Sequence, residues 1–138
     1  MNNRIRLSNW SSNVNNTIDA WRYKNFTWGK YDCLHLIYDI EKSIYGHSLI
    51  SAIADEEYAD KDQALKMCKK YGYQNWIEII KSLYTQIDKR LATLGDIGLA
   101  KYDGVYSCAV CVGVKYAAMS DSGMVFFGAE HIKRSWRI

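Results

Sequence analysis

Residues 26–33 read FTWGKYDC, and they are followed by apolar side chains at Leu34, Leu36, Ile37, Ile40 and Ile44. Aspartate is a favoured helix N-cap, and glycine permits the turn that precedes it. The stretch therefore predicts an amphipathic helix that begins at Cys33, with Asp32 as its cap. The free N–H groups and the dipole at this end of a helix favour a cysteine thiolate.

Cys33 is predicted to face the protein interior. Together with Ile37, Ile40 and Ile44 it follows the i, i+4, i+7, i+11 spacing of one helix stripe. Two interpretations remain open. Cys33 is either a small core residue, because free cysteines are often buried, or a nucleophile activated by the helix N-terminus. The second interpretation predicts that its sulfur faces the sheet formed by the later part of the chain.

Composition narrows the class of protein. A length of 138 residues predicts one domain spanning residues 1–138, and 49% hydrophobic with 14% aromatic residues predicts a packed core rather than disorder. The net charge of +3 is carried by scattered lysines and arginines, which argues against nucleic-acid binding. No apolar run is long enough to span a membrane and no secretion signal is evident, so we expect synthesis in the cytoplasm and free thiols.

The two halves of the chain differ in their hydrophobic periodicity. Helical patterns are predicted for residues 17–23, with Thr17 as the cap, then from Cys33 to Gly46, and then for residues 56–71 and 75–83. After residue 95 come short runs rich in β-branched and aromatic residues, separated by glycines. They predict four or five strands. Helices followed by an antiparallel sheet give an α+β fold.

Cys108 and Cys111 form a C-x-x-C motif, which raises the possibility of a metal or redox site. Residues an odd number apart on a strand point to opposite faces, so these two sulfurs are expected to diverge. Zinc also needs four ligands, and no second pair has suitable spacing. We expect two unrelated strand thiols, no metal and no cofactor.

Three histidines could partner Cys33 as a catalytic base. His35 lies two residues further along the same helix, about 200° around it, so its ring should point away from the thiol. His47 follows the end of that helix, roughly 20 Å from Cys33 at the helical rise per residue. His131 is not excluded by distance, although a surface histidine beside Glu130 is its ordinary explanation.

Four motifs together resemble a known family. They are Phe26-x-Trp28-Gly29-x-x-Asp32-Cys33, Gly95-Asp96-Ile97, Cys111-Val112-Gly113 and Ser135-Trp136-Arg137-Ile138. This set resembles the NlpC/P60-like proteins encoded in phage tail gene modules, a divergent branch of the papain-like superfamily. The resemblance extends from about Trp10 to residue 138. It implies a papain-like α+β arrangement, in which the Cys33 helix packs on a C-terminal antiparallel sheet.

The resemblance also implies a site with one member missing. Cys33 matches the family's nucleophile, whereas the position of the base histidine falls near Ser107 or Cys108. Neither side chain can accept a proton from a thiol as imidazole does near pH 7. The third family position falls around residues 119–121, where Ser120 or Asp121 would have no imidazole to orient.

The resulting hypothesis is a phage or prophage protein of the tail tip or of tail assembly, with an NlpC/P60-like fold and without efficient peptidase activity. Its expected partners are other tail-tip or hub proteins, and its expected location is the host cytoplasm during assembly and then the virion tail. The alternative is an active cysteine peptidase or amidase that cleaves peptidoglycan stem peptides during genome entry. In that case Cys33 is the nucleophile and a histidine elsewhere in the chain is the base.

Overall fold

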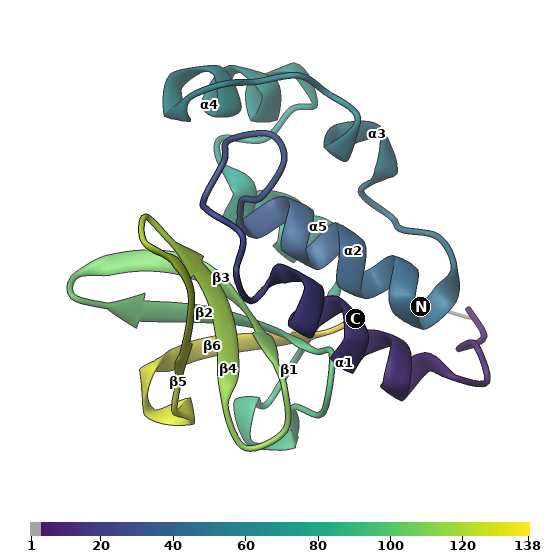
Figure 1. The fold of residues 1–138 in the computed structure, drawn as a ribbon. Coiled ribbons are helices and arrows are strands. Elements are labelled where there is room, and N and C mark those ends of the chain that lie inside the picture. The colour runs from purple at the N-terminus through teal and green to yellow at the C-terminus, as the bar shows by residue number, and fades with distance from the viewer. Residues whose placement is uncertain (1–3) are drawn as a thin grey trace.

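The computed structural model describes residues 4–138, and the first three residues of the predicted domain lie outside this range. The fold is α+β, as predicted, with N-terminal helices packed on a C-terminal antiparallel sheet (Figure 1). The helices are α1 (Trp10–Trp21), α2 (Cys33–Tyr45), α3 (Ser51–Ala54), α4 (Lys61–Lys70) and α5 (Trp76–Leu83). Within residues 4–138, no helix is both long and apolar enough to cross a membrane.

The sheet has six strands within the described residues, and five of them lie after residue 95, where four or five were predicted. They are β1 (Thr85–Ile87), β2 (Ile97–Tyr102), β3 (Val105–Cys111), β4 (Tyr116–Ser120), β5 (Gly123–Phe127) and β6 (Ile132–Arg137). Their spatial order is β1-β6-β2-β3-β4-β5, and every neighbouring pair is antiparallel. The three-residue β1 lies at an edge of the sheet and, among residues 4–138, pairs only with β6. It was not predicted because it comes before residue 95, outside the glycine-rich region from which the sheet was predicted.

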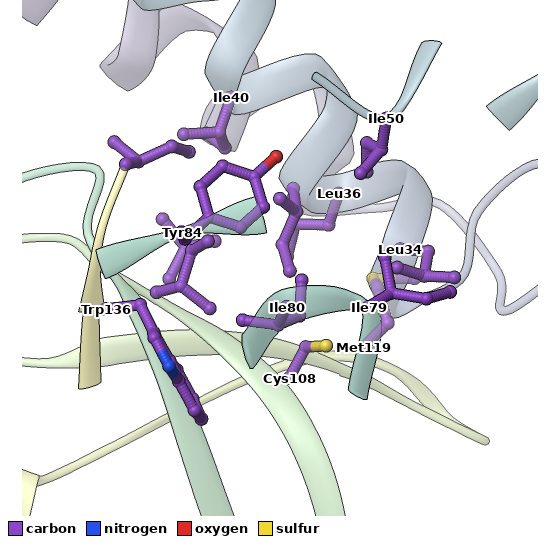
Figure 2. Packing of buried hydrophobic residues seen from close by; sticks show 14 of the residues in the cluster. Leu34, Leu36, Ile40, Ile50, Ile79, Ile80, Tyr84, Cys108, Met119 and Trp136 are labelled. Atoms are coloured by element: carbon purple, nitrogen blue, oxygen red, sulfur yellow. The ribbon is translucent and has the colours of Figure 1, made fainter. Parts of the chain in front are cut away.

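Helix α2 begins at Cys33 and ends before Gly46, as predicted. Asp32 is its N-cap, and Gly46 closes it in the left-handed conformation with φ of 80°. The helix packs against α1 on one side and against β3 and β4 on another. The predicted apolar stripe is buried, since Ile37, Ile40 and Ile44 are fully inaccessible. Figure 2 shows how this helix, α5 and the sheet enclose the core.

Two of the predicted helices differ from the structure. Helix α1 begins at Trp10, not at Thr17, because Val14, Ile18 and Trp21 already form its buried i, i+4, i+7 face. Thr17 lies inside that helix and its hydroxyl is 2.6 Å from the Ser43 hydroxyl. The helix predicted over residues 56–71 is shorter, since α4 starts only after Asp60, whose side chain caps it by accepting the Gln63 N–H. The predicted helix over residues 75–83 matches α5 and its Asn75 cap.

The contacts of Asp96 form a joint, at the end of the sheet, that connects three of the four sequence motifs. The Asp96 carboxylate is fully buried, accepts the N–H groups of Ile138 and Thr93, and pairs with the Arg137 guanidinium, whose Nε lies 3.1 Å from it. The Cys111 N–H donates to the Asp96 carbonyl, 2.8 Å away, and the Cys111 carbonyl accepts the N–H of Gly95. These bonds therefore hold three motifs in place at the end of the sheet beneath α2, namely residues 95–97, 111–113 and 135–138.

Candidate functional site

Cys33 lies half-buried at an open cleft of about 1490 Å³ between the helices and the sheet. Helices α4 and α5 form one wall, and the β2–β3 hairpin, the β4–β5 hairpin and the segment before β6 form the other. Aromatic side chains dominate the lining, among them Phe26, Trp28, Trp76, Tyr102, Tyr106 and Phe126. The thiol that the sequence singled out is therefore accessible from a groove large enough for a peptide-sized molecule.

The buried Asp32 carboxylate organises the turn that positions this thiol. One oxygen caps α2 by accepting the His35 N–H at 2.9 Å, and also lies 2.8 Å from His35 Nδ1. The other oxygen accepts the Gly29 N–H at 2.9 Å and the Tyr58 hydroxyl at 2.6 Å. Burial alone would raise the pKa of Asp32, but the His35 and Tyr58 hydrogen bonds and the His35 charge outweigh it and lower the pKa. The carboxylate is thus held ionised.

His35 is committed to this network rather than to Cys33. Its Nδ1 faces the Asp32 carboxylate and its Nε2 lies 2.9 Å from the Ala54 carbonyl. Because both partners are acceptors, both ring nitrogens are placed to donate, and this arrangement favours the protonated imidazole. Burial opposes this charge, but the Asp32 hydrogen bond and charge, with the Ala54 carbonyl, raise the pKa of His35 overall. A ring with both nitrogens occupied in this way is unsuited to accept a proton from the thiol.

Cys108 is the side chain that β3 presents to Cys33. It is fully buried in the core cluster against which Cys33 packs, together with Val110. Burial is the largest cause that raises the pKa of Cys108 well above its ordinary value, followed by a hydrogen-bond contact with the Cys33 thiol and by the Cys33 charge. Cys108 is one of the two residues near which the resemblance would place the base, and its raised pKa keeps it a protonated thiol.

The two sulfurs of the C-x-x-C motif diverge, as strand geometry predicted. Cys111 belongs to the smaller cluster on the other face of the sheet, with Tyr116 and Ile132, and its thiol donates to the Gly113 carbonyl.

Cys68, rather than Cys111, is the further cysteine that interacts with Cys33. Cys68 of α4 is buried, and burial first and the Cys33 charge second raise its pKa. Within residues 4–138, no three His, Cys, Asp or Glu side chains are arranged to hold a metal ion.

The remaining sequence candidates lie elsewhere along the cleft. His131 lines it but packs edge-on against Tyr102 and Phe127, with its Nε2 3.6 Å from the Glu130 carboxylate. Among residues 4–138, no histidine forms a hydrogen bond with Cys33. Within residues 119–121, where the resemblance would place a third site residue, the Ser120 hydroxyl donates to the Gly123 carbonyl and closes the β4–β5 turn.

Sequence comparison assigns the chain to a family without describing its chemistry. No curated protein matches the sequence. One family model matches residues 5–138, which is nearly the whole chain. The chain therefore belongs to the family described as "domain of unknown function (DUF6950)".

Proposed function

We propose that the chain is an NlpC/P60-like structural protein of a phage or prophage tail, which keeps the papain-like arrangement but not efficient peptidase chemistry. It assembles in the host cytoplasm with other tail-tip or hub proteins and then resides in the virion tail. Support for the fold comes from a cysteine at the N-terminus of a central helix that faces an antiparallel sheet across a cleft. The assignment to a tail rests on the resemblance of the four sequence motifs.

One observation carries the proposed loss of activity, namely the identity of the side chain that faces Cys33. A papain-like nucleophile needs a base that takes the thiol proton and later protonates the leaving amine. In this chain the facing side chain is Cys108, which is fully buried and has a raised pKa. A thiol that stays protonated cannot act as that base near pH 7. General acid–base assistance is typically worth about 10²- to 10⁴-fold in rate, and its absence leaves little turnover.

The alternative, an active peptidase or amidase acting on peptidoglycan, is favoured by one feature. His131 lines the same cleft as Cys33 and its ring is partly exposed. A change in the position of the segment before β6 would be needed to bring the imidazole to the thiol. His131 is therefore the residue to test first if any activity is found.

A biochemical experiment separates the two candidates. Purified protein is incubated with peptidoglycan sacculi, and the release of soluble fragments is compared with that of Cys33→Ala and His131→Ala. We expect the three proteins to release fragments at the same background rate. Release by the unmodified protein that disappears in Cys33→Ala would overturn the proposal, and parallel loss in His131→Ala would identify the base.

A genetic experiment tests the structural role. Plaque formation is measured for the phage with Cys33→Ser and for the phage that lacks the whole gene. We expect the deletion to reduce plaque formation far more than the substitution, because the fold rather than the thiol is required. Equal defects would favour the enzyme, whereas a deletion without any defect would remove the tail-assembly role.

A further inference from the structure

The thiols of Cys33 and Cys108 meet across the boundary between the helical layer and the sheet. Cys33 is the first residue of α2, which packs directly on β3, the strand that carries Cys108. Strand alternation turns Cys108 toward the helices, and Figure 2 shows its sulfur among the side chains of the core. The Cys33 side chain packs against the core cluster that contains Cys108, and after burial a hydrogen bond and the charge of Cys33 are among the causes that raise the pKa of Cys108. The resemblance indicated Ser107 or Cys108 at the position of the base, but no local pattern in either segment predicts that two thiols meet there.

The pair is asymmetric in its access to solvent. Cys33 is half-buried and lines the cleft, whereas Cys108 is fully inaccessible. Of these two thiols, a small oxidant that enters the cleft can therefore reach Cys33 but not Cys108, which belongs to the core cluster against which Cys33 packs. An accessible cysteine at a helix N-terminus with a second cysteine beside it is the arrangement in which oxidation proceeds to a disulfide rather than to higher oxides.

We propose that Cys33 and Cys108 form an oxidative modification site, at which a peroxide converts the two thiols into a disulfide that joins α2 to β3. The Cys33 thiolate attacks the peroxide, so that an S–O bond forms, the O–O bond breaks and hydroxide leaves. The Cys108 sulfur then attacks the Cys33 sulfur while its proton passes to the departing hydroxide, so that the S–S bond forms, the S–O bond breaks and water leaves. The peroxide is reduced to water and the two cysteines lose two electrons and two protons.

Cys68 is the competing partner, and its placement makes it the weaker one. It lies on α4, which forms a wall of the cleft, and after burial it is the charge of Cys33, not a hydrogen bond with Cys33, that raises the pKa of Cys68. Among the larger contacts between elements of residues 4–138, α4 packs only with α5, whereas α2 packs directly on β3 and β4. The bond to Cys108 therefore joins two elements that already pack against each other.

The test uses the purified chain in the reduced state, treated with limiting hydrogen peroxide and then blocked with iodoacetamide. Trypsin leaves Cys108 and Cys111 on one peptide between Lys101 and Lys115, so the crosslink is mapped in the Cys111→Ser protein. Cys111 faces the other side of the sheet, which makes this variant a matched background. We expect one crosslinked pair of peptides, containing Cys33 and Cys108, that dithiothreitol separates.

Two further variants, each in the Cys111→Ser background, identify the roles. Cys68→Ser is expected to crosslink at an unchanged rate. Cys108→Ser is expected to stop at a sulfenic acid on Cys33, which dimedone traps in a stoichiometric adduct. A Cys33–Cys68 crosslink, a crosslink between two chains, or conversion of Cys33 to the sulfinic acid while Cys108 stays reduced would each overturn the proposal. If Cys108→Ser does not fold, the crosslink mapped in the Cys111→Ser protein alone still tests the proposal. None of these results depends on peptidase activity.

Discussion

Replacing Asp32 with alanine is predicted to destabilise the fold far more than the loss of an ordinary helix cap. Asp60 provides the matched control, because it caps α4 through the same type of hydrogen bond but is exposed and accepts from Gln63 alone. Asp32 is buried and accepts from four donors on three segments of the chain. The difference between the stability losses of the two alanine variants therefore measures the hydrogen-bond network of Asp32 apart from its role as a helix cap.

The expected magnitude follows from the groups that lose their acceptor. Loss of the cap costs about 1 kcal/mol at either position. At Asp32 the Tyr58 hydroxyl is also left unpaired in the core, which costs about 1–3 kcal/mol, and the half-buried Gly29 N–H adds about 1 kcal/mol. His35 can release its proton, so its charge adds little. Asp32→Ala should therefore lower the free energy of unfolding by about 3–5 kcal/mol, against about 1 kcal/mol for Asp60→Ala.

Urea unfolding followed by tryptophan fluorescence and by circular dichroism measures both values. Asp32→Asn serves as a milder variant, because it keeps an oxygen for the cap but replaces the other acceptor with a donor. It should fall between the unmodified protein and Asp32→Ala. Equal losses for Asp32→Ala and Asp60→Ala would refute the conclusion that the Asp32 network positions Cys33.

Two other predictions concern the ion pair and the sheet joint. The pKa of His35 is raised above its ordinary 6.5, so its contribution is full below pH 6.5 and is lost as the pH rises through the folded-state pKa. The pKa of Asp32 is lowered below its ordinary 3.8, so its contribution is lost only as the pH falls through that lower value. Urea midpoints from pH 6 to pH 9 should therefore fall more for the unmodified protein than for His35→Gln, and parallel curves would contradict the ion pair. Gly95→Ala should cost more stability than Gly72→Ala: both glycines have positive φ, but a Cβ on Gly95 would lie 2.8 Å from Ile44 whereas Gly72 has open space. Equal melting temperatures for these two variants would show that the joint tolerates a side chain.

Local sequence patterns were sufficient to predict the part of the site that lies within a single segment of the chain. Asp32 and Cys33 are adjacent, and the apolar positions after them specify the helix and the face that it buries. The divergence of Cys108 and Cys111 likewise follows from strand parity alone. These features depend on spacing within a few residues, which is what hydrophobic periodicity encodes.

The parts that sequence reasoning missed depend on long-range packing. Tyr58 fell within a predicted helix, but it lies in the loop before α4, where its hydroxyl reaches Asp32. Cys68 is buried on α4, yet nothing in its own segment indicates that it comes within reach of the Cys33 charge. The early start of α1 had a local signal, the i, i+4, i+7 spacing that begins at Val14, which the polar residues around it obscured.

The position of β6 has a consequence for how the chain folds. Strands β2 and β3 form a hairpin from adjacent residues, whereas β6 is the last strand in sequence and is inserted between β1 and β2. Until residues 132–137 have left the ribosome, β2 has an unpaired edge and the Asp96 carboxylate lacks the Arg137 partner that it has in the folded state. An exposed strand edge is a site for pairing with other chains. A nascent or truncated chain that ends before Ile132 is therefore expected to depend on chaperones, and to aggregate where they are scarce.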